Sequence, residues 1–368
     1  MQRSAALTVM QILPALNMGG VERGTVEFAR YLKQQGHRAI VVSGGGYQVQ
    51  ALENTGVEHI QLPVGKKSPL TFRYVPTLRK IFKQYNVDIV HARSRLPAWL
   101  CYFALRKKPR PPYFVTTLHG LHSVSRYSSV MARGDAVVAV SKTAADYLQQ
   151  NFKKHLKTQP QVIYRGVDFK VFKFGYQADK QWVAALEARH PALKNSQKVL
   201  LPGRLTAVKG FENIMPWLGQ SGANQYLLVT ADSNQTDYTK RLFESLKQAG
   251  LSEKVIWIGP QQRMADLYAY VDLTLSINRK PESFGRTVLE SLTVGTPVVG
   301  LNHGGVGEIL TALFPSGLVP VGDDDRLIRW IKAMLLKPAV MASQTQFSNQ
   351  QQFQQTVALY QQLLAQKS

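Results

Sequence analysis

The chain of 368 residues contains a single cysteine, Cys101, and no uninterrupted apolar run of the roughly 18 residues that a membrane-spanning helix needs. One cysteine excludes an internal disulfide and is typical of a reducing compartment, so we expect a cytoplasmic protein. The apolar segment 7–13 runs into Asn17 and Gly19-Gly20 without a small-residue cleavage pattern. We therefore interpret it as a buried first strand and not as a signal peptide.

Acidic residues are scarce in the first half of the chain. Residues 1–180 hold 27 Lys and Arg against 9 Asp and Glu, whereas residues 181–368 hold 18 against 14. Nearly all of the net charge of +22 therefore belongs to the first half. This asymmetry favours an anionic partner for that half, either nucleic acid, anionic lipid or a phosphorylated substrate, and composition alone leaves a basic surface without a partner as the alternative.

Short apolar strands alternate with amphipathic segments along the whole chain. Continuous apolar strands separated by helices favour parallel sheets covered on both faces, and the pattern restarts after a polar stretch near 175–196. We predict an α/β protein of two doubly wound Rossmann-like domains facing across a cleft, with the active site in that cleft. The expected strands are 7–13, 38–42, 58–62, 87–91, 113–117, 136–140, 161–164, 198–202, 225–229, 254–258, 272–276, 296–300 and 317–320.

The predicted boundaries are 1–177 for the first domain, 178–345 for the second and 346–368 for a terminal segment. Residues 347–366 in that segment read as one amphipathic helix, because four apolar residues follow the spacing of a single helix face. These residues are Phe353, Val357, Tyr360 and Leu364.

The segment PESFGRTVLES, residues 281–291, holds two glutamates around a turn into a helix. Gly285 permits the tight turn, and the amides of the first helical turn form an anion site. A sugar diphosphate bound there would present its sugar hydroxyls to Glu282 and its ribose to Glu290, since carboxylates accept hydroxyl hydrogen bonds well. Solvated glutamates on an ordinary loop and helix are the alternative.

Two cations, Arg204 and Lys209, stand in the loop LPGRLTAVKGFEN, residues 201–213, where Gly203 and Gly210 free the backbone. A diphosphate leaving group gains negative charge as the glycosidic bond breaks, and fixed cations stabilise that charge most in the transition state. Two solvated surface cations are the alternative.

Gly19-Gly20 lie between the first strand and its helix, where bare backbone lets a phosphate or sugar approach closely. The G-x-G-x-x-G spacing of a dinucleotide site is absent, which disfavours a nicotinamide enzyme. A purely structural turn remains open for these two glycines.

Together these motifs resemble family 4 of the retaining glycosyltransferases, which have the GT-B fold, over nearly the whole chain. The resemblance implies that Arg204 and Lys209 hold the donor diphosphate, that Glu282 contacts the transferred sugar and that Glu290 contacts the ribose. It also implies that the terminal helix crosses back to the first domain. The other residues implied in donor binding or catalysis are Gly19, Gly20, His119, Phe284, Gly285, Arg286 and Thr287.

In such enzymes a donor phosphate oxygen takes the acceptor proton, so the resemblance implies no protein nucleophile, no metal and no cofactor. The chain departs from the family pattern at Arg165, where many members carry asparagine, and at Arg286-Thr287, where small apolar residues are common. Base contacts are expected near Ala231 and in residues 259–263.

Clustered cations follow the aromatic segment LPAWLCYFAL, residues 96–105. This combination suits a membrane interface with anionic lipids, whereas a helix buried against the sheet with a solvated basic end is the alternative. Residues 91–128 also resemble bacterial enzymes of lipopolysaccharide core assembly. That implies a hexose donor, UDP-linked in preference to GDP-linked, a glycolipid or phosphorylated saccharide acceptor bound by Arg93, Arg95 and Arg126, and a place at the inner face of the cytoplasmic membrane.

A nucleotide-sugar epimerase of the same fold and a basic nucleic-acid-binding protein are the competing functions. The basic first domain disfavours an epimerase, which needs no acceptor surface. The chain lacks a recognised nucleic-acid-binding motif, so no nucleic acid is expected as a partner. Two further motifs carry no chemistry in this interpretation: Asp323-Asp324-Asp325 is expected to cap a helix, and glycines 44–46 are expected to form a loop.

Overall fold

The computed structural model describes residues 6–17, 19–106 and 111–366. The chain divides into two compact units. Unit 1 comprises the described residues up to Tyr164 together with those from Gln350, and unit 2 comprises Arg165–Asn349. The first boundary therefore lies upstream of the predicted residue 177, and the second lies four residues after the predicted 345. The terminal helix belongs to unit 1.

Unit 1 is built on a seven-stranded parallel sheet in the order β3-β2-β1-β4-β5-β6-β7. The strand order reverses between β1 and β4, and Gln11 of β1 lies opposite His91 of β4. Parallel sheets of this kind bind ligands beyond the carboxyl ends of the strands at such a switch point. The strands are β1 (Thr8–Ile12), β2 (Arg38–Ser43), β3 (Glu58–Gln61), β4 (Ile89–Ala92), β5 (Tyr113–Leu118), β6 (Ala136–Ala139) and β7 (Gln161–Val162).

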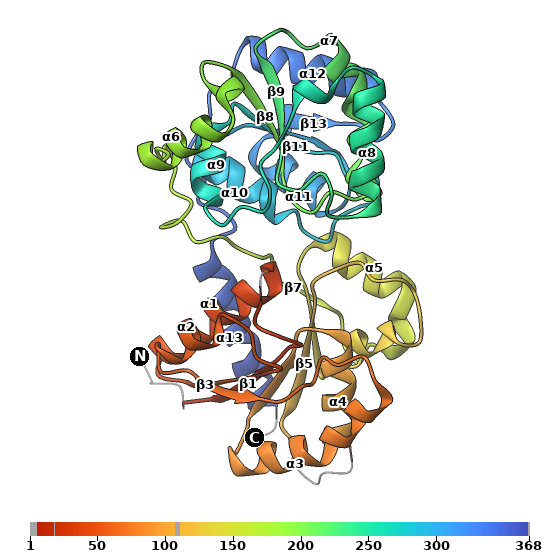
Figure 1. Cartoon of the computed structure of the whole chain (residues 1–368). Helices are drawn as coiled ribbons and strands as arrows, with labels where there is room; N and C mark the ends of the chain where they lie inside the picture. The colour runs from red at the N-terminus through yellow and green to blue at the C-terminus, as the bar shows by residue number, and fades with distance from the viewer. Residues whose placement is uncertain (1–5, 18, 107–110, 367–368) are drawn as a thin grey trace. The chain divides into compact units, whose positions relative to one another are not determined.

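Helices α1 and α13 share the core of one face of this sheet, far apart in sequence but side by side in space (Figure 1). α1 forms because Thr25, Phe28, Ala29 and Leu32 recur at helical spacing and all are buried. The ring of Phe28 lies 5.3 Å from that of Phe353 in α13. The helices of unit 1 are α1 (Gly20–Gln34), α2 (Val49–Glu53), α3 (Tyr74–Gln84), α4 (Arg95–Leu105), α5 (Lys142–Phe152) and α13 (Asn349–Ala365).

Unit 2 repeats the plan with a six-stranded parallel sheet in the order β10-β9-β8-β11-β12-β13. Its strand order reverses between β8 and β11. The strands are β8 (Gln197–Leu201), β9 (Gln225–Val229), β10 (Val255–Trp257), β11 (Leu273–Ser276), β12 (Val298–Leu301) and β13 (Leu318–Val319). The helices are α6 (Lys180–Arg189), α7 (Met215–Gln220), α8 (Asp237–Gln248), α9 (Met264–Tyr270), α10 (Arg286–Val294), α11 (Gly304–Leu313) and α12 (Asp324–Leu336).

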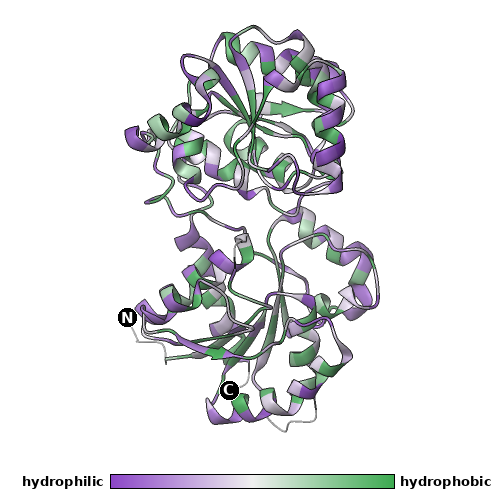
Figure 2. Ribbon diagram, in the orientation of Figure 1, coloured by the Kyte–Doolittle hydropathy of each residue, from purple (hydrophilic) through white to green (hydrophobic). Residues whose placement is uncertain are grey.

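Each of the predicted strands overlaps an observed one, and the predicted fold class of two doubly wound parallel sheets is confirmed. The central strands are mostly hydrophobic, as the predominantly green strands of Figure 2 show. The terminal helix buries Phe353, Val357 and Tyr360 as predicted, with Leu363 as its next fully buried residue. Among the described residues, no helix combines the length and the apolar character that crossing a bilayer requires.

Candidate active site

The donor motifs of unit 2 gather at the carboxyl edge of its switch point. The loop that follows β8 carries Gly203, Arg204 and Lys209, and the loop that follows β11 carries Asn278 and Glu282. Because β8 and β11 are adjacent parallel strands, their carboxyl ends open at the same place. The two loops that the sequence predicted to bind the donor therefore lie at one site.

Lys209 and Glu282 are in direct contact. Nζ of Lys209 lies 3.3 Å from Oε1 of Glu282, and the two side chains are 17% and 28% exposed. Asn278 donates a hydrogen bond to the same Oε1 atom. The other carboxylate oxygen of Glu282 has no partner among the described residues, so it is available to hydroxyl groups of a ligand.

Glycines hold the cationic loop close to the strand ends. Gly210 has φ of 70°, and a Cβ there would lie 2.2 Å from the carbonyl oxygen of Ile277, the residue after β11. Any other residue would therefore both strain the backbone and push this loop away from the sheet. The amide of Gly203 is fixed by a 2.7 Å hydrogen bond to Oγ1 of Thr230.

The backbone of Glu282 is held from a third loop. Gly305 donates its amide to the carbonyl of Glu282 at 2.8 Å, and Nε2 of His303 lies 2.8 Å from the carbonyl oxygen of Asn278. Sequence reasoning missed this support from the His303-Gly304-Gly305 segment after β12. Its signal was a glycine pair between a strand and a helix, the same pattern that singled out Gly19-Gly20.

Glu290 lies inside α10 and is 4% exposed. Its Oε1 accepts from Nε of Arg286 at 2.9 Å, and its Oε2 accepts from the hydroxyl of Tyr268 at 3.2 Å. Both carboxylate oxygens of Glu290 therefore accept hydrogen bonds from the protein. One donor is Arg286, a position where the chain differs from the family pattern. A ribose hydroxyl would have to use the remaining lone pairs of this carboxylate, so ribose binding by Glu290 stays a prediction.

The first turn of α10 has the predicted form. Gly285 is the N-cap with φ of 95°, Phe284 is buried, and α10 begins at Arg286, followed by Thr287. A helix N-terminus with a glycine cap exposes backbone amides to an anion. Binding of sugar and phosphate by these amides stays a prediction.

Arg204 and the Gly19-Gly20 turn have surroundings that differ from each other. Arg204 is exposed and makes no hydrogen bond or ion pair with another described residue. A Cβ at Gly19 would lie 2.2 Å from Oε2 of Glu22, so a carboxylate already stands at the N-terminus of α1. A phosphate could approach Gly19 and Gly20 only if Glu22 moved, because like charges repel.

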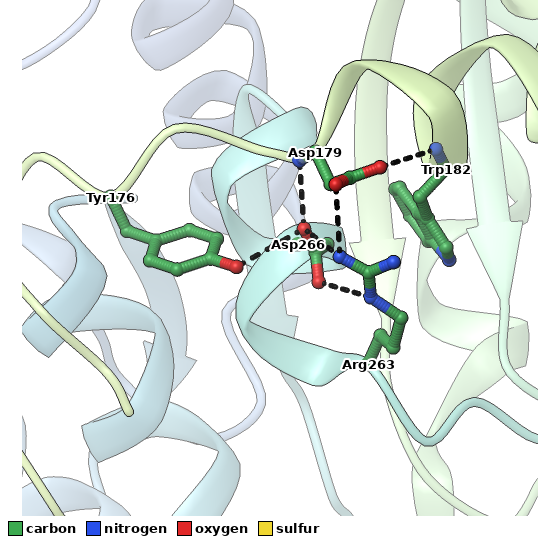
Figure 3. A network of polar contacts seen from close by, with 5 residues as sticks. All are labelled: Tyr176, Asp179, Trp182, Arg263 and Asp266. Atoms are coloured by element: carbon green, nitrogen blue, oxygen red, sulfur yellow. Dashed lines mark hydrogen bonds and ion pairs between the residues drawn. The ribbon is translucent and has the colours of Figure 1, made fainter. Parts of the chain in front are cut away.

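Arg263, near the predicted base contacts, belongs instead to the polar network of Figure 3. Its Nε lies 2.8 Å from Oδ2 of Asp266, and its NH2 lies 3.8 Å from Oδ2 of Asp179. Asp266 is buried and also accepts from the amide of Asp179 at 2.8 Å and from the hydroxyl of Tyr176 at 3.2 Å. This network fastens segment 176–179 to α9, so the guanidinium of Arg263 is committed to the protein.

The switch point of unit 1 carries a line of buried polar groups. His91 is 1% exposed, with Nδ1 2.5 Å from the hydroxyl of Tyr360 and Nε2 2.6 Å from that of Thr117. Burial, and next the positive charge of Arg93, hold the pKa of His91 well below its ordinary value. His91 is therefore neutral, accepting from one hydroxyl and donating to the other. His119, two residues beyond Thr117, stands partly exposed after β5.

The three arginines predicted to bind the acceptor lie in different surroundings. Arg93 is 6% exposed, and its guanidinium carbon lies 5.6 Å from the ring centroid of Phe28. Arg95 donates to Oγ of Ser128 at 3.1 Å and lies over the ring of Tyr127, whereas Arg126 is exposed. No contact among the described residues joins the three, and their binding of an acceptor stays a prediction.

The aspartates 323–325 and the glycines 44–46, which were predicted to carry no chemistry, have structural roles. Oδ1 of Asp323 accepts from the amide of Arg326 at 2.9 Å and caps α12. Glycines 44–46 form the loop between β2 and α2. Cys101 is buried in α4, where burial raises the pKa of its thiol, as expected for an inert core residue.

Two family models match the chain in succession. Glycosyltransferase Family 4 matches residues 18–171, and Glycosyl transferases group 1 matches residues 184–352. A curated relative, N-acetyl-alpha-D-glucosaminyl L-malate synthase of Bacillus anthracis, is 23% identical over 83% of this chain and 82% of its own. The lipopolysaccharide core biosynthesis mannosyltransferase LpsB of Rhizobium meliloti is 28% identical over 64% of this chain and 65% of its own.

Solved structures share the fold over nearly the full length. A glycosyltransferase from Rickettsia africae has a TM-score of 0.82 at 28% identity, covering 98% of this chain and 99% of its own. Anabaena HepE, in a complex with UDP-glucose, has a TM-score of 0.76 at 21% identity, covering 96% of this chain and 99% of its own. The latter likeness concerns the fold alone.

Proposed function

We propose, from the premise that the chain belongs to the family 4 glycosyltransferases with the GT-B fold, that it is a retaining hexosyltransferase. It would take a hexose from a nucleotide diphosphate sugar, UDP-linked in preference to GDP-linked, and transfer it to a glycolipid at the inner face of the cytoplasmic membrane. The contact between Lys209 and Glu282 supports the donor half of this proposal, because a cation that would bind the diphosphate lies beside a carboxylate that would accept hydrogen bonds from the sugar. HepE, which shares the fold of this chain, was solved in a complex with UDP-glucose, and on that ground we propose a UDP-linked donor.

The proposed roles follow from charge and position. Lys209 and Arg204 would neutralise the diphosphate as it leaves, and Glu282 would orient the sugar through its remaining oxygen. A donor phosphate oxygen would take the acceptor proton, with no covalent bond to the protein. His119 would face the transferred sugar.

The donor proposal is tested by thermal-shift measurements with a panel of UDP- and GDP-linked hexoses. A ligand that binds only the folded protein stabilises it in proportion to the logarithm of its concentration over Kd. Wild type should gain the largest shift with one UDP-linked hexose, and Arg204→Ala and Lys209→Met should lose that shift. Lys240→Met, an exposed lysine of α8, is the matched control and should keep it. A shift that survives in both site variants would refute the assignment.

The glycolipid half of the proposal depends on a surface of unit 1 that we call the aromatic ridge: Phe72, Trp99, Tyr102 and Phe103. Trp99 stacks on Phe103 at 5.5 Å between ring centroids, and Phe103 meets Phe72 edge-on at 5.8 Å. α4 is thus divided: its inner face buries Ala98, Cys101 and Ala104, while its ridge residues stay partly exposed. The sequence allowed two interpretations of this segment, a membrane interface and a helix buried against the sheet. The ridge face fits the first interpretation, and the inner face fits the second.

Positive charge surrounds the aromatic ridge. Arg133 lies 5.7 Å from the ring of Trp99, and Arg106 lies 5.7 Å from that of Tyr102. Residues 63–134 contain 14 Lys and Arg but only one acidic residue, Asp88, which bonds the amide of Thr8. Aromatic rings among cations match a bilayer surface with anionic headgroups. The lipopolysaccharide function of LpsB supports a core saccharide as acceptor. Lys107, Lys108 and Arg110, which belong to the basic cluster named in the sequence analysis, lie outside the described residues.

Vesicle sedimentation tests the membrane surface separately from the donor site. The protein should sediment with phosphatidylglycerol vesicles and not with phosphatidylcholine vesicles. The double variant Trp99→Ser/Phe103→Ser should bind anionic vesicles at least tenfold more weakly, with its UDP-hexose shift retained. Phe243→Ser, which removes an exposed aromatic residue of unit 2, is the control. Equal vesicle binding by wild type and the double variant would contradict the docking surface.

A further inference from the structure

Arg93 is a buried cation without a counter-ion in the described part of the chain. Its side chain is 6% exposed, its Nε is inaccessible to solvent, and its guanidinium makes no hydrogen bond or ion pair with any described residue. Burial lowers the pKa of Arg93 to about 10, which still leaves it charged at neutral pH. An unpaired buried charge is costly, so proteins pair such charges with an internal carboxylate or with a ligand.

The position of Arg93 is that of a ligand-binding residue. It directly follows β4, and its amide donates to the carbonyl of Ile12, the last residue of β1, at 3.1 Å. Arg93 therefore stands at the carboxyl edge between β1 and β4, where the strand order of unit 1 reverses. Lys209 and Glu282 occupy the equivalent place between β8 and β11 of unit 2.

Among the described residues, the groups in contact with Arg93 and with its neighbour His91 carry no negative charge. Because strand residues two apart share a face, Arg93 lies on the same side of the sheet as His91. His91 is neutral and bonded to Tyr360 and Thr117, while burial raises the pKa of Tyr360 and keeps its phenol protonated. The guanidinium carbon of Arg93 lies over the ring of Phe28, 5.6 Å from its centroid. Because these hydroxyls, the imidazole and the aromatic ring are uncharged, they do not neutralise the guanidinium of Arg93, which can therefore bind an anionic ligand.

We propose that Arg93 binds an oxyanion of the acceptor, a carboxylate or a phosphate, in a site of unit 1 that α1 and α13 complete through Phe28 and Tyr360. This proposal rests on the proposed glycosyl transfer, in which unit 1 receives the acceptor. The guanidinium offers a planar fork of donors that matches either oxyanion with two parallel hydrogen bonds. Of the three arginines predicted to bind the acceptor, Arg93 alone is buried, whereas Arg95 contacts Ser128 and Tyr127 and Arg126 is exposed.

The test measures thermal shifts with glucose 6-phosphate and with glucuronate, at constant ionic strength and with UDP saturating the donor site. Wild type should be stabilised by at least one of the two probes, and the effective probe identifies phosphate or carboxylate as the natural group. Arg93→Met should lose at least tenfold in affinity for that probe. Arg73→Met, which removes an exposed arginine just before α3 of unit 1, should keep it.

Stability without a probe separates a binding role from a structural one. Met retains the packing on Phe28 and removes the uncompensated charge, so Arg93→Met should melt at the same temperature as wild type or higher. A lower melting temperature for Arg93→Met would indicate a structural arginine and overturn the proposal. It would also be overturned if neither probe stabilised wild type, or if both variants kept the shift. A normal UDP shift in those same samples would leave the glycosyltransferase proposal standing.

Discussion

The two units share one doubly wound plan, but three cations of unit 2 are paired with carboxylates, whereas the arginines that follow β4 in unit 1 are not. In unit 2, Lys209, Arg286 and Arg263 contact the carboxylates of Glu282, Glu290 and Asp266. In unit 1, Arg93 lies on the ring of Phe28, and Arg95 contacts Tyr127 and Ser128. Paired charges have fixed geometry, which suits a site that must hold a leaving group in place. Unpaired cations keep their charge for a ligand.

The largest effect should come from breaking the pair in the donor site. Lys209→Met removes the cation beside Glu282 and should lower the rate of UDP release from the donor sugar about 10²–10³-fold, the usual loss for one group that stabilises developing charge. Steady-state release of UDP measures it, with Lys240→Met as the unchanged control. An unaltered rate would show that the pair is structural.

Backbone strain should distinguish the cationic loop of unit 2 from an ordinary helix end of unit 1. Gly210→Ala combines positive φ with a clash on Ile277 and should cost about 3 kcal/mol in free energy of unfolding. Gly36→Ala, at the end of α1, has φ of 81° but open space around it and should cost only about 1 kcal/mol. Urea unfolding of both variants measures the difference. Similar midpoints would mean that the loop yields to the added methyl group.

The network at Asp266 gives unit 2 an acid-sensitive contact. Asp266→Ala leaves the amide of Asp179 and the hydroxyl of Tyr176 without their acceptor and should cost about 2 kcal/mol at neutral pH. Burial alone would raise the pKa of Asp266, but the amide of Asp179 and the guanidinium of Arg263 lower it below its ordinary value.

A carboxylate with a lowered pKa stabilises the fold above its unfolded pKa of about 4, and this contribution is lost as the pH falls through the folded pKa. The stability difference between wild type and Asp266→Ala should therefore persist at pH 7 and shrink below about pH 4. Urea midpoints at several pH values measure it. A difference that stayed constant down to pH 2 would contradict the charged role.

The smallest effect should come from the buried, uncharged polar groups of unit 1, which are His91, Thr117 and Tyr360. Tyr360→Phe removes one hydroxyl from His91 and should cost about 1 kcal/mol, as for a single buried hydrogen bond. Tyr47→Phe, at a 62% exposed tyrosine, is the control and should not change the urea midpoint. A loss of several kcal/mol would show that α13 depends on this bond to dock.

Short-range patterns predicted much of this molecule. Apolar runs such as 225–229 became strands at the predicted residues, because a strand covered on both faces has to be apolar throughout. Asp323 was predicted as a helix cap for a similar reason, since an N-cap depends on groups only three residues away. The motifs around Lys209 and Glu282 predicted that two loops would serve one donor site.

Contacts between distant residues were decided only by the tertiary structure. No local pattern could show that Tyr360 bonds His91 across 269 positions, that Glu22 covers Gly19, or that Arg263 turns to Asp266. The sequence by itself determined which segments become strands and helices, because that depends on neighbours along the chain. The packing of sheets and helices decided which charged side chains form pairs and which, like Arg93, are buried without a partner. Pairing requires atoms that are distant in sequence to come together in space.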